Sequence, residues 1–143
     1  MLTPEQYAEI KSRYDTRHAL VVDYCKAHHT SGIPAEVYKD WPTVTNDETS
    51  ALEVYQFVTD PPDRYFAYVN HDEGDPGYGK PCTITTWTGE PIAQGKFTSR
   101  LYINSMGDKR ITFTAKGING KVYNGTFYYS AGDYCRMKQS VAH

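Results

Sequence analysis

A series of short alternating runs, separated by glycine-containing turns, is the feature that most limits what this chain can fold into. Within the runs, ring or aliphatic residues tend to recur at every second position, which is the period of a β-strand. The runs, all within residues 64–139, are RYFAYVN, CTITTWT, IAQGKFTSRLYI, RITFTAKG, KVYNGTFYY and YCRMKQ. Asn119-Gly120, between two of them, is the strongest short signal for a β-hairpin. Short strands joined by tight turns predict a small antiparallel β meander, either a barrel or a sandwich.

The first part of the chain carries helix signals instead. Thr3 is a predicted N-cap, Pro4 takes the first helical position, and Gln6 stands where the partner of a capping box belongs. We expect a helix over residues 3–29, stopped at Gly32, and a second helix over residues 45–58, before the helix-breaking Asp-Pro-Pro-Asp. The sequence therefore predicts an α+β protein, with N-terminal helices in residues 1–63 and one compact antiparallel β domain in residues 64–143.

Charge is divided unequally along the chain. The net charge of −2 combines residues 1–78, with six Lys or Arg against 14 Asp or Glu, and residues 79–143, with nine Lys or Arg against three Asp or Glu. This division predicts that the basic residues 79–143 have a negatively charged partner. Three partners are possible: an anionic ligand, nucleic acid, or the acidic part of the same or a neighbouring chain. We expect a homo-oligomer, a dimer or a higher even assembly, in which acidic helices meet basic strands.

The cysteine content and the hydropathy of the sequence indicate the cellular compartment in which we expect the protein. Three cysteines leave one unpaired in any disulfide scheme, and a chain of 143 residues does not need disulfides to hold a core. The N-terminal MLTPEQYAEI lacks the basic and apolar regions of a signal peptide, and no apolar run reaches membrane-spanning length. We expect a cytoplasmic protein, without disulfides and without contact to a membrane.

Residues that carry catalysis or bind metal ions are scarce. His71, Asp72, Glu73 and Asp75 share one loop, but the loop lacks the ligand spacing of a calcium site and is typical of a solvated surface. The sequence contains no HExxH or CxxC motif, and neither Cys82 nor Cys135 has a histidine close by in the sequence. We therefore expect no catalytic residue, metal ion or cofactor, and a binding protein rather than an enzyme.

Cations and rings gather in the predicted β domain. Alternation turns Cys135 inward and Arg136 outward, with Tyr134 and Lys138 beside it. Arginine pairs with phosphate through a planar fork, and aromatic rings stack on nucleobases. Small residues such as Gly89, Gly95 and Gly125 are expected to let a ligand approach the backbone. This combination predicts a nucleotide-binding site, formed by the following cations together with Trp87 and Tyr134: Arg100, Lys109, Arg110 and Arg136.

The segments TTWTGEPIAQGKF and GDKRITFTAKGINGKVYNGTFYYSAGDYCRMK carry a resemblance to a known family. Their Trp-Thr-Gly turn, Ile-Asn-Gly turn, Tyr-x-Gly and closing Gly-Asp-Tyr-x-Arg resemble the first anti-Thoeris family of phage sponge proteins. The resemblance covers residues 80–139 well and the N-terminal half in outline. It implies a helical part joined to a compact β region, assembled as a dimer or larger. Members sequester cyclic ADP-ribose isomers without cleaving them, and some are associated with cyclic oligonucleotide signals.

The resemblance also implies roles for particular residues. An aromatic ring, an asparagine and arginines line the ligand in that family, so Trp87 takes the aromatic role and Arg136 that of the closing arginine. The asparagine is Asn104 or Asn119, and Asn119 is also explained as the first residue of a tight turn. The basic pair Lys109 and Arg110 is proposed from charge alone.

The expected function is thus that of a phage-encoded immune-evasion protein that binds and sequesters a cyclic nucleotide-type defence signal. One alternative is a small barrel that binds nucleic acid, against which the net charge of −2 argues. Another is a protein that inhibits a host defence enzyme directly through its tyrosine-rich surface. A third is an enzyme that degrades the signal, against which the shortage of candidate bases and metal ligands argues.

Overall fold

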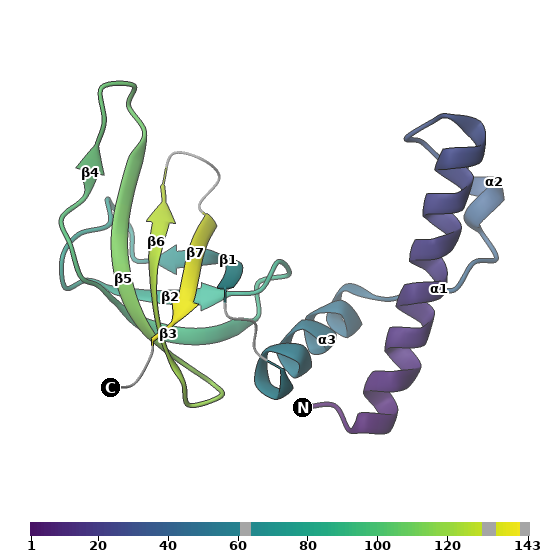
Figure 1. The fold of residues 1–143 in the computed structure, drawn as a ribbon, viewed down its shortest axis with the longest axis horizontal. Coiled ribbons are helices and arrows are strands. Elements are labelled where there is room, and N and C mark those ends of the chain that lie inside the picture. Colours follow the sequence, from purple (N-terminus) through teal and green to yellow (C-terminus); the bar gives the residue numbers. More distant parts are fainter. Residues whose placement is uncertain (61–63, 130–133, 141–143) are drawn as a thin grey trace. The chain divides into compact units, whose positions relative to one another are not determined.

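The computed structural model describes residues 1–60, 64–129 and 134–140, and the chain folds as two compact units (Figure 1). The units are Met1–Tyr55 and Gln56–His143, so the division lies inside a helix rather than at residue 63. N-terminal helices are followed by an antiparallel barrel, which confirms the predicted α+β class. Among the described residues, no helix has the length and apolar character needed to cross a membrane.

The helices begin where the capping residues predict. Helix α1 spans Pro4–His28, and its N-cap Thr3 exchanges hydrogen bonds with Gln6 in a complete capping box. Helix α2 spans Ala35–Tyr38, and α3 spans Asn46–Thr59 with a second box between Thr45 and Glu48. The predicted extent of the first helix, residues 3–29, is confirmed: α1 ends at His28, and its C-cap His29 has a left-handed φ of 49°.

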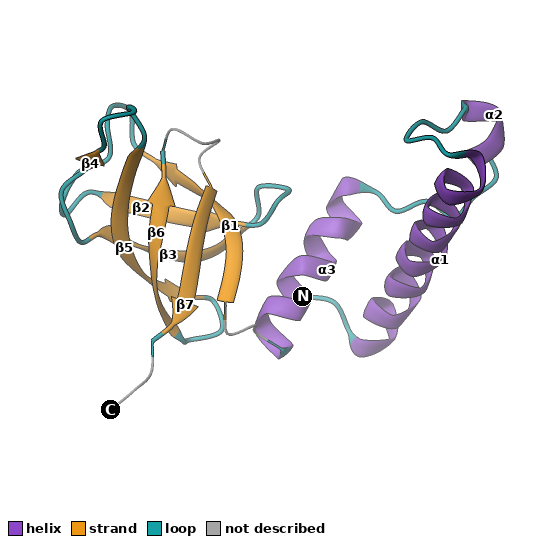
Figure 2. Ribbon diagram, turned by 45° about the horizontal axis from the view of Figure 1, so that its top comes forward, coloured by secondary structure: helices purple, strands orange, loops and turns teal. Residues whose placement is uncertain are grey.

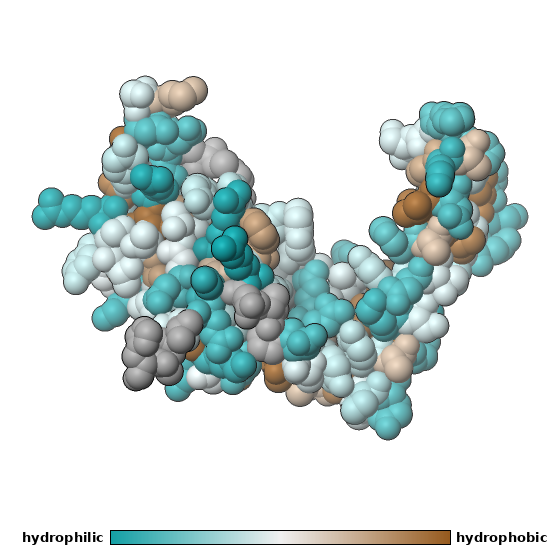
Figure 3. All heavy atoms as spheres, viewed as in Figure 1, coloured by the Kyte–Doolittle hydropathy of each residue, from teal (hydrophilic) through white to brown (hydrophobic). Residues whose placement is uncertain are grey.

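Polar contacts hold the first unit together. Arg13 binds Glu48 and the carbonyl of Thr43, and Arg17 donates to the carbonyl of Pro42 at 3.1 Å. In Met1–Tyr55, all of it described, Ile10 and Leu52 are the only buried residues. Apolar residues are visible on the surface formed by α2 and the C-terminal half of α1 (Figure 3). The helical unit therefore has little core of its own.

Acid is expected to loosen this unit through Glu48. Hydrogen bonds from Arg13 and from the Thr45 backbone lower the pKa of Glu48 from 4.5 to about 2. A carboxyl whose pKa falls on folding stabilises the fold above its unfolded value and loses that effect as pH falls through its folded value. We expect a small loss of far-UV circular dichroism between pH 4.5 and about 2, reduced in Glu48→Gln. Superimposable acid titrations of the two proteins contradict this expectation.

Six strands close the second unit into an antiparallel barrel (Figure 2). Together with the short β4, which is not part of the ring, the described strands of this unit number seven: β1 (Arg64–His71), β2 (Pro81–Thr85), β3 (Pro91–Phe97), β4 (Tyr102–Ile103), β5 (Lys109–Gly117), β6 (Val122–Tyr128) and β7 (Tyr134–Gln139). The sheet order is β3-β2-β1-β7-β6-β5-β4, and an additional pairing of β3 with β5 completes the ring. The two-residue β4 lies outside the ring and pairs with the start of β5.

Alternation fills the barrel with rings and aliphatic side chains. Phe97, Phe113, Tyr123 and Phe127 are almost fully buried, and Cys135 lies inward as predicted. One run was wrong as a single strand, because residues 92–103 divide into β3 and β4 around an irregular link. In that link Ser99 accepts a hydrogen bond from the Thr112 amide through its hydroxyl oxygen, at 3.0 Å.

Two glycines of the barrel have a packing role instead of the expected role in ligand approach. A Cβ on Gly95 would lie 1.8 Å from the carbonyl oxygen of Thr114 on β5. A Cβ on Gly125 would lie 2.5 Å from both the Phe113 ring and the carbonyl oxygen of Arg136. These positions let strands and core rings approach closely, so their small size follows from the barrel.

Candidate ligand-binding site on the outer face of the barrel

A row of aromatic residues and one arginine crosses the outer face of four barrel strands and β4. The register pairs Tyr68 of β1 with Tyr134 of β7, and Tyr134 with Tyr128 of β6. Tyr128 in turn pairs with Arg110 of β5, and Arg110 with Tyr102 of β4. Side chains of directly paired residues lie about 4.5–5.5 Å apart at Cβ. Residues far apart in the sequence thus form one continuous surface.

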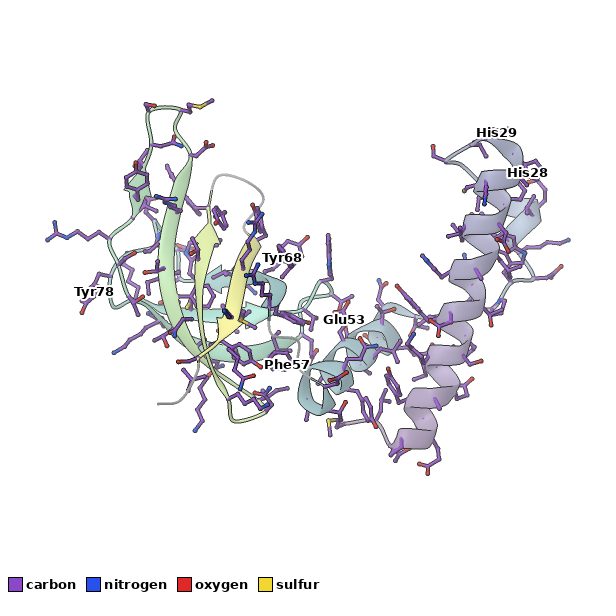
Figure 4. The ribbon with its side chains drawn as sticks, in the orientation of Figure 1. His28, His29, Glu53, Phe57, Tyr68 and Tyr78 are labelled. Carbon is purple, nitrogen blue, oxygen red and sulfur yellow. The ribbon has the colours of Figure 1, made fainter. Side chains whose placement is uncertain are left out.

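The geometry within this row is that of stacked rings and a cation. The rings of Tyr128 and Tyr134 stack with centroids 5.1 Å apart and planes 17° apart. The Arg110 guanidinium lies 4.7 Å from the centre of the Tyr102 ring. At the other end, the Trp87 ring meets Tyr68, labelled in Figure 4, edge to face at 5.1 Å. Such rings present flat faces or edges to any planar ligand.

A pocket of about 420 Å³ opens beside the Arg110 end of the row. Its lining consists of Tyr102, Asn104, Asp108, Lys109, Arg110, Tyr128 and Tyr134. This volume lies within the range of small-ligand sites in proteins. Asn104 is held in its loop, since its Oδ1 accepts the amides of Met106 and Asp108. The pocket therefore combines three rings and two cations with a fixed polar loop.

A second row continues the same face next to the first. Phe66 of β1 pairs with Arg136 of β7, and Arg136 pairs with Thr126 of β6. The Arg136 guanidinium lies 5.5 Å from the Phe66 ring centre and 5.7 Å from that of Tyr128. Within the described part of the chain, Arg136 makes these ring contacts and no ion pair. Arg110 and Arg136 thus lie on the two strands that flank Tyr128.

The charged residues of the strands are all positive. The seven strands contain seven Lys or Arg residues and no Asp or Glu. The described acidic residues of the barrel unit lie in turns and links and directly after α3, and Asp108 is the one that lines the pocket. The Asp108 carboxylate accepts a hydrogen bond of 3.2 Å from Asn104 Nδ2. An anionic group is therefore favoured on the Arg110 and Arg136 side of the pocket.

The structure brings together most of the predicted site residues. Asn104, Lys109, Arg110 and Tyr134 line the pocket. Arg136 lies in the adjoining row, and Trp87 lies at the far end of the first row, outside a strand in the turn after β2. Their roles stay predictions.

Two predicted site residues lie elsewhere. Arg100 is exposed in the link between β3 and β4 and does not line the pocket. Asn119 lies in the turn of the β5–β6 hairpin, at the opposite end from Arg110. Of the two asparagines, Asn104 is therefore the one placed at the pocket.

Sequence reasoning missed four rings of this face: Phe66, Tyr68, Tyr102 and Tyr128. Alternation does place Phe66 and Tyr68 on the outward side of β1, opposite the buried Ala67 and Val69. That signal identifies an exposed position but does not say which residues of other strands lie next to it.

Asn119 is expected to matter for stability and not for binding. Its Nδ2 donates to the buried Tyr123 hydroxyl at 2.9 Å, and its Oδ1 accepts the Lys121 amide at 3.1 Å. Asn119→Ala leaves a buried hydroxyl unpaired, which costs about 1–3 kcal/mol of unfolding free energy. Urea melts check this, with Tyr123→Phe and the double variant completing the cycle. If Asn119→Ala abolishes nucleotide binding at unchanged stability, Asn119 belongs to the site after all.

The buried cysteines have little nucleophilic character. Burial raises the pKa of Cys82 to about 11 and that of Cys135 to about 12, so both are thiols at neutral pH. Among the described residues, no group of three or more His, Cys, Asp or Glu side chains is placed to hold a metal ion. The groups that the outer face offers are rings for stacking and cations for ion pairing. No protein-family model, curated protein or solved structure matches this chain.

Proposed function

We propose that this protein binds a nucleotide-type ligand on the outer face of its barrel and sequesters it intact. The observation that carries the proposal is the group of rings and cations at the pocket, in which Tyr128 stacks on Tyr134, and Arg110 and Arg136 lie on the two strands that flank Tyr128. The biological role that fits this chemistry is phage immune evasion, by removal of a cyclic nucleotide defence signal such as a cyclic ADP-ribose isomer.

Each part of such a ligand has a matching group. A nucleobase has a flat π-face, and stacking of a base on an aromatic side chain contributes about 1–3 kcal/mol. Tyr128 and Tyr134 supply rings at the pocket wall, and Tyr102 adds a third. Two linked phosphates need two cations in fixed positions, and the guanidinium groups of Arg110 and Arg136 suit bidentate pairing with them.

The chemistry of the lining supports sequestration over cleavage. The seven lining residues include no histidine or cysteine, and the Asp108 carboxylate accepts a hydrogen bond from Asn104. A general base must be within hydrogen-bond reach of the proton it removes, and the described lining offers no other carboxylate. The resemblance of the Trp-Thr-Gly and Gly-Asp-Tyr-x-Arg segments to the first anti-Thoeris family supports the same ligand class.

A retention experiment tests this function. The purified protein is incubated with AMP, ADP-ribose, cyclic ADP-ribose isomers and cyclic di- and trinucleotides, separated from unbound compound, heat-denatured and analysed by liquid chromatography with mass spectrometry. We expect one of the cyclic compounds to be recovered intact from the wild type and from Lys121→Ala, a variant of an exposed cation in the turn after β5. Recovery of a cleaved product indicates an enzyme, and retention of none of these compounds contradicts the proposal.

Self-association is a separate part of the proposal. The helical unit buries only Ile10 and Leu52, and helices depend on tertiary packing for most of their stability. Its five Lys or Arg and nine Asp or Glu make it acidic, whereas the barrel strands are basic. We expect a dimer or higher even assembly that weakens with added salt, because charges are screened within about 10 Å at 0.1 M. Sedimentation across a salt series checks this, and a monomer at every salt concentration contradicts it.

A further inference from the structure

Beyond the pocket, the outer face carries a second group of rings and cations, here named the β1–β7 patch. It consists of Arg64, Phe66, Tyr68, Trp87, Arg136 and Lys138. None of these residues lines the pocket. Two cross-strand pairs, Arg64 with Lys138 and Phe66 with Arg136, bring the residues of β1 and β7 together. The patch meets the pocket where Tyr68 pairs with Tyr134.

Two rings of this patch are largely exposed to solvent, and the barrel core does not need them. Phe66 is 60% exposed and Trp87 is 73% exposed. The inward positions of β1 hold Ala67 and Val69, which are buried, so the barrel core is complete without Phe66. Exposed rings that adjoin one another and border cations are typical of an interaction surface.

The cations of the patch lack acidic neighbours along the strands. Arg64 and Lys138 face each other directly across β1 and β7, a pairing of like charges that is unfavourable without a counter-ion. Arg136 lies two residues before Lys138 on the same outward face, and no strand contributes Asp or Glu. Three cations held together in this way favour a ligand with more than one negative charge.

We propose that the patch and the pocket together bind single-stranded nucleic acid, with one nucleotide in the pocket and its neighbours along β7 and β1. Bases stack on Tyr128 and Tyr134 in the pocket and on Phe66, Tyr68 and Trp87 in the patch. Phosphates pair with Arg110, Arg136 and Lys138. This inference shares one premise with the proposed function, which is that the pocket binds a nucleotide.

The dimensions and the exposed rings favour a single strand over both a mononucleotide and a duplex. From Arg110 on β5 to Tyr68 on β1 the row crosses three strand spacings, or about 14 Å, which exceeds the width of one base. Base stacking on protein rings requires bases that are not stacked in a duplex. The net charge of −2 does not oppose this, because the acidic residues of the described chain lie outside the strands.

Fluorescence anisotropy tests the inference. The probes are labelled oligothymidylates of 2, 4, 8 and 12 nucleotides and a 12-base-pair duplex. We expect affinity to rise with length beyond two nucleotides, and the duplex to bind more weakly than the 12-mer at equal salt. With three phosphates paired, the slope of log K against log salt is about −2 for a single strand. Phe66→Ala is expected to weaken 12-mer binding roughly 5- to 150-fold, the equivalent of one lost stacking contact.

Controls separate this inference from the proposed function. Lys121→Ala is expected to match the wild type, and thermal melts show whether Phe66→Ala folds normally. Should Phe66→Ala melt early, Lys138→Ala replaces it, because removal of that exposed cation is expected to lower the salt slope. Affinity that does not depend on length, or equal 12-mer binding by these patch variants and the wild type, overturns the inference even if a cyclic nucleotide is retained. Patch-dependent 12-mer binding without retention of any cyclic nucleotide supports the inference and overturns the sequestration role.

Discussion

Arg110→Ala is expected to weaken binding of a retained nucleotide roughly 30- to several-thousandfold while the melting temperature of the free protein stays nearly unchanged. Arg110 is exposed on β5, and its guanidinium contacts the Tyr102 ring, so removing it takes little from the core. Losing one partner of a charge pair within a binding site costs about 2–5 kcal/mol of binding free energy, and each 1.4 kcal/mol is tenfold in affinity. An exposed residue away from special features changes stability by only about 0.5 kcal/mol.

Two further variants sharpen this result. Arg136→Ala is expected to act in the same direction, because Arg136 borders the pocket through Tyr128. Arg110→Lys is expected to restore part of the affinity, since lysine keeps the charge and lacks the planar fork. Calorimetric titration gives the affinities and thermal melts give the stabilities. Unchanged affinity in Arg110→Ala removes the residue from the site, and a lost fold means that its role is structural.

The local parts of the fold could be predicted because their causes lie within a few residues. Thr3 and Gln6 are three positions apart, so the capping box is visible in the sequence and is present in the structure. The inward Cys135 and outward Arg136 follow from the alternation of β7 alone. The hairpin at Asn119-Gly120 needs only its own turn residues, and Gly120 has the positive φ of 81° that such a turn requires.

The candidate site could be predicted only in part, because its layout depends on which strands are neighbours. Tyr68 meets Tyr134 because β1 pairs with β7, which local periodicity does not encode. Arg136 reaches Phe66 through the same pairing, and Phe66 by itself is one outward ring in an alternating strand. The charge division did place the cations in the β domain, but which cations share one face depends on strand pairing.

Gly95→Ala is expected to destabilise the barrel by more than about 3 kcal/mol. The added Cβ would lie 1.8 Å from the Thr114 carbonyl oxygen and 2.5 Å from Ala115 Cα, both backbone atoms of β5. No side chain can rotate to relieve the contact, so β3 must move away from β5. Gly95 pairs directly with Ala115 in the β3–β5 ladder, and that ladder closes the barrel. Overpacking of a well-packed interior costs about 1–3 kcal/mol, and displacement of a closing strand adds lost hydrogen bonds.

Gly77→Ala is the matched control within the same unit. A Cβ there meets only the flexible Lys80 side chain at 3.8 Å, and Gly77 has no positive φ. Alanine at such a position restricts the unfolded chain and is expected to be neutral or stabilising by up to about 1 kcal/mol. For a domain of this size 1 kcal/mol shifts the melting temperature by about 4–8 °C, so Gly95→Ala is expected to melt at least 12 °C lower, or not to fold. Equal melting temperatures of the two variants would mean that β3 and β5 do not approach this closely. The pairing of β3 with β5 that closes the barrel would then be wrong.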